Sequence, residues 1–165
     1  MANITIAEAL EMIRTTSKFH HSCRVAVHMK SLAEYFGENP IEWELVGLLH
    51  DLDYDETKNQ RELHGILTAE KLRGRISNRA LNAIKSHDYR TNIEQESRLA
   101  RILMAADALD IFIEMLAEFG EIPSVEEIIE KLKENDFDKP WLPRIIRNCE
   151  YEDILLSKFI ELKEL

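Results

Sequence analysis

The sequence is poor in the residues that build turns and disulfides. Its 165 residues include 5 Gly, 4 Pro and 2 Cys. The scarcity of Gly and Pro argues against a turn-rich β fold and favours helices. Cys23 and Cys149 lie too far apart in sequence to form a Cys-x-x-Cys motif. We therefore expect reduced cysteines in a cytoplasmic setting rather than a disulfide scaffold.

Long apolar runs and an excess of basic charge are also absent. No apolar run approaches the ~20 residues of a membrane-spanning helix. The first residues show no basic region followed by an apolar one, so no signal peptide is expected. The formal net charge of −10 argues against general nucleic-acid binding, which needs a surplus of Lys and Arg. We predict a cytoplasmic protein without membrane or general nucleic-acid partners.

Helical patterns fill most of the chain. Capping boxes at Thr5-x-x-Glu8 and Ser124-x-x-Glu127 open two of the expected helices. The polar stretch from 51 to 60 is expected to be a loop. The expected helices cover residues 5–15, 18–36, 39–50, 62–73, 77–87, 93–119 and 124–135, with one or two more in 141–165. These segments predict an all-α fold of about seven or eight helices in one domain.

The most informative motif is the doublet His50-Asp51 at the end of an apolar helix. Neutral imidazole and carboxylate are both metal ligands, and a carboxylate can bridge two ions. The doublet therefore raises the question of whether other His and Asp side chains converge on it.

Helical periodicity selects partners for the doublet. In the segment 18–36, His21 lies one turn before Val25 and continues its apolar stripe. His20 lies about 100° away and is the poorer candidate. His28 borders the same face. His21 is therefore the first expected partner.

Asp107 is the second expected partner. It follows Leu99 and Leu103 at steps of four, so it points where leucines point. A buried ionised Asp is costly unless it is paired or coordinated. Asp110 is the runner-up. A single His or Asp of this kind could be a hydrogen-bonded core side chain or a solvated one. Three helices that each place a His or Asp on a core-facing position favour a shared metal site.

These residues, in this order, carry a resemblance to a known family. His21 stands in His-Ser-Cys-Arg-Val-Ala, the doublet in Leu-Leu-His-Asp-Leu-Asp, and Asp107 in Met-Ala-Ala-Asp-Ala-Leu. The chain resembles the HD-domain metal-dependent phosphohydrolase superfamily, specifically its HDIG-type subgroup. The resemblance spans residues 19–116 and implies an all-α helical bundle on which the helices of 124–165 pack. It also implies one divalent metal bound by His21, His50, Asp51 and Asp107.

The resemblance further implies a second ion in some members. His64 and His87 would bind it, with Asp51 as the bridge. The metal would be Fe, Mn, Co, Ni or Mg, and the number of ions stays open at one or two. The chain departs from many relatives by having His87-Asp88 in place of adjacent histidines. Asp88 would orient a ligand or face solvent, and solvent is favoured; the alternative for His64 is a solvated residue at a helix start.

The implied activity is hydrolysis of a phosphomonoester or phosphodiester, a nucleotide being one candidate, by a metal-activated hydroxide held at Asp51. A phosphate substrate needs cations in an acidic protein. Arg24, three residues after His21, and Lys85, two before His87, are expected to hold phosphate, against the alternative of ordinary solvated charges. The loop 53–56 is interpreted as a plain loop rather than a gate.

Two other functions stay open. The same ligand architecture serves a di-iron oxygenase in some relatives, and a non-catalytic HD module would act as a metal-stabilised sensor. The intact ligand set argues against the sensor. The apolar residues of the final helix could pack internally or form a homodimer contact. The sequence does not identify the substrate.

Overall fold

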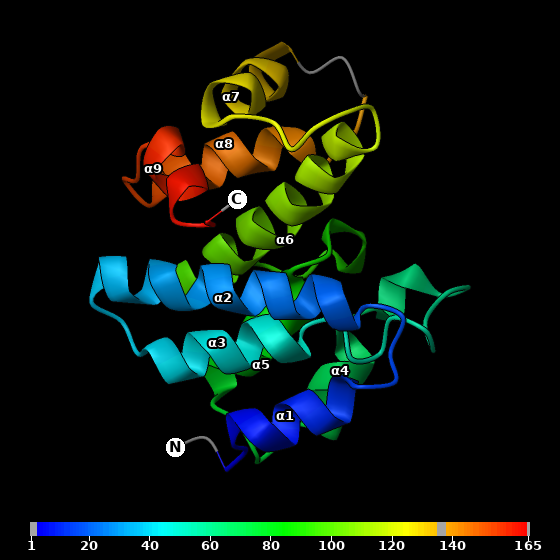
Figure 1. The fold of residues 1–165 in the computed structure, drawn as a ribbon. Coiled ribbons are helices and arrows are strands. Elements are labelled where there is room, and N and C mark those ends of the chain that lie inside the picture. Colours follow the sequence, from blue (N-terminus) through cyan, green and yellow to red (C-terminus); the bar gives the residue numbers. More distant parts are fainter. Residues whose placement is uncertain (1–2, 135–137, 165) are drawn as a thin grey trace.

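The computed structural model describes residues 3–134 and 138–164. Within them the chain forms nine α-helices and two short 3₁₀ helices, with no strand (Figure 1), so the all-α prediction is confirmed. The elements are α1 Ile6–Ile13, α2 Phe19–Phe36, α3 Pro40–Leu49, η1 Arg61–Leu63, α4 Ile66–Lys71, α5 Asn78–Ser86, η2 Tyr89–Thr91, α6 Arg98–Ala117, α7 Val125–Glu134, α8 Leu142–Tyr151 and α9 Leu156–Glu161.

The helices are arranged around α2, α3 and α6. Helices α2 and α3 lie along each other in the middle of the molecule, and α1 and α5 pack on α3 (Figure 1). Helix α6 contacts α2 and α5 and packs against α8. Helices α7 and α9 pack together at the top of the view. The buried apolar residues form one cluster from Ile4 to Ile160. This arrangement brings α2, α3 and α6 to a common centre.

A glycine sets the distance between α2 and α3. A Cβ built on Gly47 would lie 2.6 Å from the Cα of Ala26, closer than real contacts allow. The backbones therefore touch at this point. Asn39 caps the start of α3 by accepting from the backbone N–H groups of Ile41 and Glu42. The close packing places His21 and His50, one on each helix, at the same end of the pair.

The predicted apolar stripes are buried. Val25, Met29 and Leu32 of α2 are fully enclosed, as is Trp43 of α3. His28 is also fully buried, and its Nε2 donates to the carbonyl oxygen of Phe159 at 2.8 Å. This contact ties α9 to α2. His28 is therefore a core residue of the helix interface.

The predicted helix 62–73 is wrong in its first part. The structure has η1, a break at His64 and Gly65, and the short helix α4. His64 is extended and Gly65 has a φ of 80°, in the left-handed region that favours glycine. The break turns His64 inward, so it is buried rather than solvated.

The predicted helix 93–119 begins later than expected. Ser97 caps α6 by accepting from the N–H of Ala100. The preceding segment is held away from helical geometry by the Asn82 side chain, which donates to the Glu94 carbonyl and accepts from the Glu96 N–H. Side-chain hydrogen bonds to the backbone thus win over local helix propensity. The expected end of 124–135 at Asn135 lies outside the described residues.

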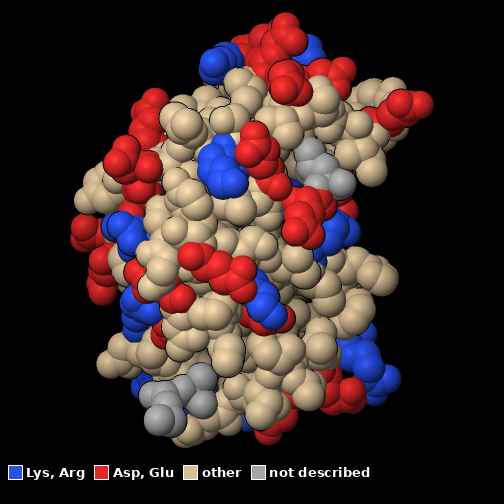
Figure 2. All heavy atoms as spheres, turned by 60° about the vertical axis from the view of Figure 1, so that its left-hand side comes forward, with Lys and Arg blue, Asp and Glu red and all other residues tan. Residues whose placement is uncertain are grey.

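No helix in the described part of the chain is long and apolar enough to cross a membrane. On the face shown in Figure 2, Lys and Arg side chains are interspersed with Asp and Glu among the described residues and do not gather in one patch.

Both cysteines are free. Cys149 is buried, and burial raises the pKa of its thiol to about 12.

Candidate metal centre

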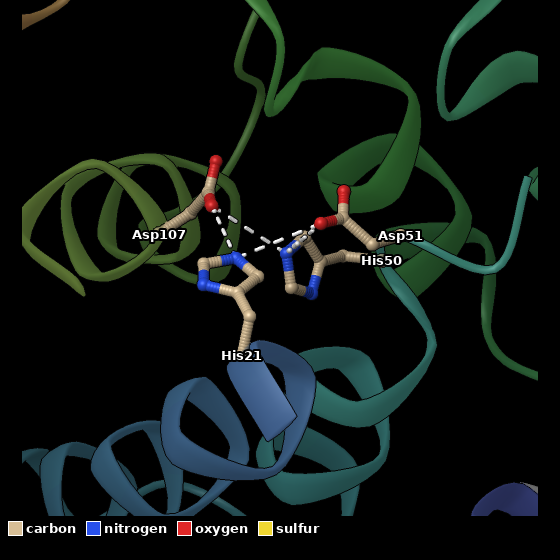
Figure 3. Close-up of side chains that lie close together, drawn as sticks. All are labelled: His21, His50, Asp51 and Asp107. Carbon is tan, nitrogen blue, oxygen red and sulfur yellow. Dashed lines mark hydrogen bonds and ion pairs between the residues drawn. The ribbon is translucent and has the colours of Figure 1, made fainter. Parts of the chain in front are cut away.

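Four side chains from three helices converge at the centre of the molecule. His21 comes from α2, His50 from the residue that ends α3, Asp51 from the next position and Asp107 from α6 (Figure 3). The Nε2 of His21 lies 2.9 Å from Oδ1 of Asp107 and 3.6 Å from Oδ2 of Asp51. The Nε2 of His50 lies 3.5 Å from each of the same two oxygens. The four ligand atoms therefore surround one point, at the spacing of a metal site.

The outer ring nitrogens fix the orientation of these two imidazoles. Nδ1 of His21 donates to Asp110 at 2.7 Å, and Nδ1 of His50 donates to the carbonyl of Gly47 at 2.8 Å. With Nδ1 protonated, Nε2 of a neutral imidazole carries a lone pair. Nε2 of His50 is buried and has no hydrogen-bond partner. A divalent cation would satisfy this otherwise costly buried atom, so the residues fit a metal.

A second group shares Asp51 with the first. Oδ1 of Asp51 lies 2.9 Å from Nε2 of His64 and 3.5 Å from Nε2 of His87. The two Nε2 atoms are 3.2 Å apart. Their Nδ1 atoms donate to Asp53 at 2.7 Å and to the carbonyl of Ile84 at 2.6 Å, so two lone pairs face each other unless a cation lies between them. The two oxygens of Asp51 thus face two separate ligand groups.

The carboxylates make the centre favour bound positive charge. Burial lowers the pKa of an imidazole, yet hydrogen bonds to Asp107 and Asp110 outweigh it and raise the pKa of His21 to about 10. Burial likewise lowers the pKa of His64, but hydrogen bonds to Asp51 and Asp53 outweigh it and raise this pKa to about 9. Burial opposes ionisation of Asp51 and Asp107, but the surrounding histidines hold both pKa values below the usual range. The centre therefore attracts cations, whether protons or metal ions.

A cavity of about 230 Å³ opens onto this centre. Asp51, His64, His87 and Asp107 line it. Its remaining lining combines two cations with aromatic and aliphatic side chains: Lys18, Arg90, Tyr54, Tyr89, Trp141 and Ile111, with Asp88, Met104 and Ala108 completing it. The cavity therefore combines charged, aromatic and aliphatic groups next to the candidate metal ligands.

The comparison with known families agrees with the geometry. A family model described as HD domain matches residues 19–111, which contain all six converging His and Asp residues. The chain belongs to the HD domain family. The match is to the family as a whole, and the HDIG-type subgroup stays a prediction. Searches of curated proteins and of solved structures found no match.

Neither cation expected to hold phosphate lines the cavity of this HD domain. Arg24 bonds to Asp110 at 2.9 and 3.0 Å and also pairs with Glu114, on the far side of His21. Lys85 is half-buried on α5 and is not among the described residues of the lining. Lys18 and Arg90 line the cavity instead. Each lies three residues from a histidine of the centre, which is the signal that sequence reasoning missed.

The sequence left the roles of Asp88 and Asp110 open, and the structure gives both residues defined contacts. Asp110 is buried and accepts from His21, Arg24 and Lys163. Asp88 is buried rather than solvent-facing, and it holds Arg90 through the backbone N–H and the guanidinium. Asp110 thus orients a histidine of the centre, whereas Asp88 orients a cation of the cavity.

Asp53 is a residue of the HD domain that sequence reasoning placed in a plain loop. It is fully buried. Its carboxylate accepts from Nδ1 of His64 at 2.7 Å and from the N–H groups of Gly65 and Thr68 at 2.8 and 2.9 Å. Burial would raise its pKa, but these bonds hold the pKa below its usual value. The carboxylate therefore fixes His64 and the backbone break beside it.

We expect Asp53→Asn to weaken metal binding at the His64 group about 10- to 100-fold, because an amide cannot replace a carboxylate that accepts from an imidazole and two N–H groups. Titration calorimetry with Mn²⁺ would measure the two affinities separately. Glu62→Gln, an exposed change nearby, serves as the control. Equal Mn²⁺ affinities in Asp53→Asn and the parent protein would show that Asp53 has no part in orienting His64.

Proposed function

We propose that this HD domain protein is a phosphohydrolase that cleaves a phosphate ester with two divalent ions. One ion would be held by His21, His50, Asp51 and Asp107, and the other by Asp51, His64 and His87. The observation that carries the proposal is the position of Asp51, whose two carboxylate oxygens face two groups of imidazole Nε2 atoms.

The roles of the chain's own residues follow from their contacts. Asp110, Gly47, Asp53 and Ile84 each accept from an Nδ1–H and aim the opposite nitrogen at the centre. Asp51 keeps the two ligand groups adjacent. Ions bound there would supply an activated water and neutralise charge on a phosphoryl oxygen. No Ser or Cys nucleophile is required.

The cavity supports a phosphorylated small molecule as the substrate. Four of the proposed ligands line it, and Lys18 and Arg90 supply positive charge in a chain whose formal net charge is −10. The aromatic rings of Tyr89 and Trp141 offer an apolar surface for the organic part. A nucleotide is one candidate, because a base can stack on such rings.

Metal loading followed by hydrolysis tests the proposal. We expect purified protein loaded with Mn²⁺, Fe²⁺, Co²⁺ or Ni²⁺ to bind two ions and to release phosphate or p-nitrophenol from phosphate esters. His87→Ala should lower the metal count from two toward one, whereas His20→Ala, an exposed neighbour of His21, should not. An unchanged count in His87→Ala would mean a mononuclear site. Oxygen consumption without phosphate release would indicate an oxygenase instead.

A further inference from the structure

Lys18 differs from the other cations around the centre. It lies at the start of α2, one turn before His21, and lines the cavity. Within residues 3–134 and 138–164 it has no carboxylate within ion-pair distance. Its charge is available to a ligand in the cavity.

The position of Lys18 is fixed from two sides. Its Nζ lies 4.4 Å from the centroid of the Tyr54 ring, a cation–π contact. The same ring lies edge-on to His64 at 5.4 Å. The preceding residue, Ser17, donates its backbone N–H and its hydroxyl to the Asp55 carboxylate at 2.8 and 2.5 Å. The segment that follows the His-Asp doublet thus holds the ammonium group beside the second ligand group.

Of the other candidate cations, Lys85 does not line the cavity, and the two arginines are already paired. Arg90 is bound through Nε and Nη2 to Asp88. Arg24 is bound to Asp110 and Glu114 and does not line the cavity. An ion pair offsets much of the charge that a guanidinium presents to a ligand. Lys18 is therefore the stronger phosphate-binding candidate within the described cavity lining.

We propose that Lys18 binds a terminal oxygen of the phosphate and so makes the centre select phosphomonoesters over phosphodiesters; this rests on the hydrolase function proposed above. A monoester carries up to two negative charges and three terminal oxygens, so an oxygen remains for Lys18 beside those directed at the His and Asp groups. A diester carries one charge, and its second organic group occupies an oxygen that would otherwise face the ammonium.

The reaction balances without an additional reactant. The oxygen of one water molecule forms a bond to phosphorus, the ester P–O bond breaks, and the departing oxygen takes a proton to become an alcohol. Lys18 keeps its proton throughout. Its contribution is a charge-assisted hydrogen bond to the phosphate, which is typically associated with an effect of about 10- to 100-fold.

Two esters with the same leaving group test the selectivity. In Mn²⁺-loaded protein, Lys18→Met should lower kcat/KM for p-nitrophenyl phosphate about 10- to 100-fold, and that for bis(p-nitrophenyl) phosphate less than threefold. Lys18→Arg should restore most of the monoester activity. Lys30→Met, which removes an exposed Lys on the same helix, is the matched control. The Mn²⁺ content of all variants should stay at the parent value.

Binding of inorganic phosphate separates this proposal from the hydrolase function. Calorimetry on Mn²⁺-loaded protein should show about 10-fold weaker phosphate binding in Lys18→Met. If neither ester is hydrolysed but phosphate binding falls in this way, the Lys18 site stands and the hydrolase function fails. Equal losses of kcat/KM for both esters would overturn the proposed selectivity for monoesters. Unchanged phosphate binding, or a loss found in Lys85→Met instead, would overturn the assignment of Lys18.

Discussion

Asp51→Ala is expected to remove both metal ions and to abolish hydrolysis while the helices remain. Oδ2 of Asp51 faces His21 and His50, and Oδ1 faces His64 and His87. Its loss leaves neither group with its full ligand set. Two-ion clamps supply several kcal/mol of transition-state stabilisation, so activity should fall by about a thousandfold or more. Elemental analysis, circular dichroism and kinetics on the same preparation measure all three effects.

The exposed variant Glu62→Ala provides the control for Asp51→Ala, since it removes a nearby carboxylate without touching the centre. It should keep two ions and full activity. Two retained ions in Asp51→Ala would contradict the bridging role. A collapse of the helical signal would show instead that Asp51 is needed for folding, in which case Asp51→Asn, which preserves the shape, would distinguish the two roles.

Gly65→Ala should both destabilise the protein and disturb the second ligand group. Gly65 has a φ of 80°, and a Cβ there would lie 2.4 Å from the carbonyl oxygen of Ile84 and 3.3 Å from the ring of His87. That carbonyl is the acceptor that orients His87. The left-handed conformation costs about 1–3 kcal/mol for a non-glycine residue, and the clash adds to it. Urea unfolding and metal analysis report the two effects.

Gly74→Ala isolates the contribution of the backbone. Gly74 has nearly the same φ, 75°, but a Cβ there would meet nothing within 4 Å. We expect the Gly74→Ala variant to lose stability only through the cost of the left-handed backbone conformation, and to keep both ions. If Gly65→Ala lost no more stability than Gly74→Ala and kept two ions, the close packing of Gly65 against Ile84 and His87 would have no functional role.

Helical periodicity predicted the part of the centre that lies on regular helices. His21 and Asp107 replace apolar residues in stripes that repeat every three or four positions, so their inward direction could be derived from spacing. The same reasoning identified Asp110 as the neighbour on that face. The family resemblance added His64 and His87, which have no apolar stripe to reveal them.

The residues that sequence reasoning missed depend on contacts between distant segments. Asp53 stands in a polar stretch without periodicity, and only the fold brings Gly65 and Thr68 to its carboxylate. Lys18 precedes the regular part of α2, and its ammonium group contacts the ring of Tyr54, a residue distant in sequence. Arg24 lies one turn from His21 as expected, but Asp110, on the facing helix, binds it.

The cavity also depends on a part of the chain outside the family match. Residues 19–111 supply the ligand groups, whereas Trp141, at the start of α8, also lines the cavity. Helix α8 is held against α6 by Asn148, whose side chain donates to the carbonyl of Arg101 at 2.8 Å. The C-terminal helices therefore shape the space available to the organic part of a substrate.

The central claim is that Asp51 bridges two metal ions in one centre. A crystal structure of Mn²⁺-loaded protein, with anomalous scattering recorded at the manganese edge, tests it most directly. We predict two anomalous peaks, one beside His21, His50 and Asp107 and the other beside His64 and His87, each next to a different oxygen of Asp51. A single peak at the first group, or ions bound away from Asp51, would contradict the account.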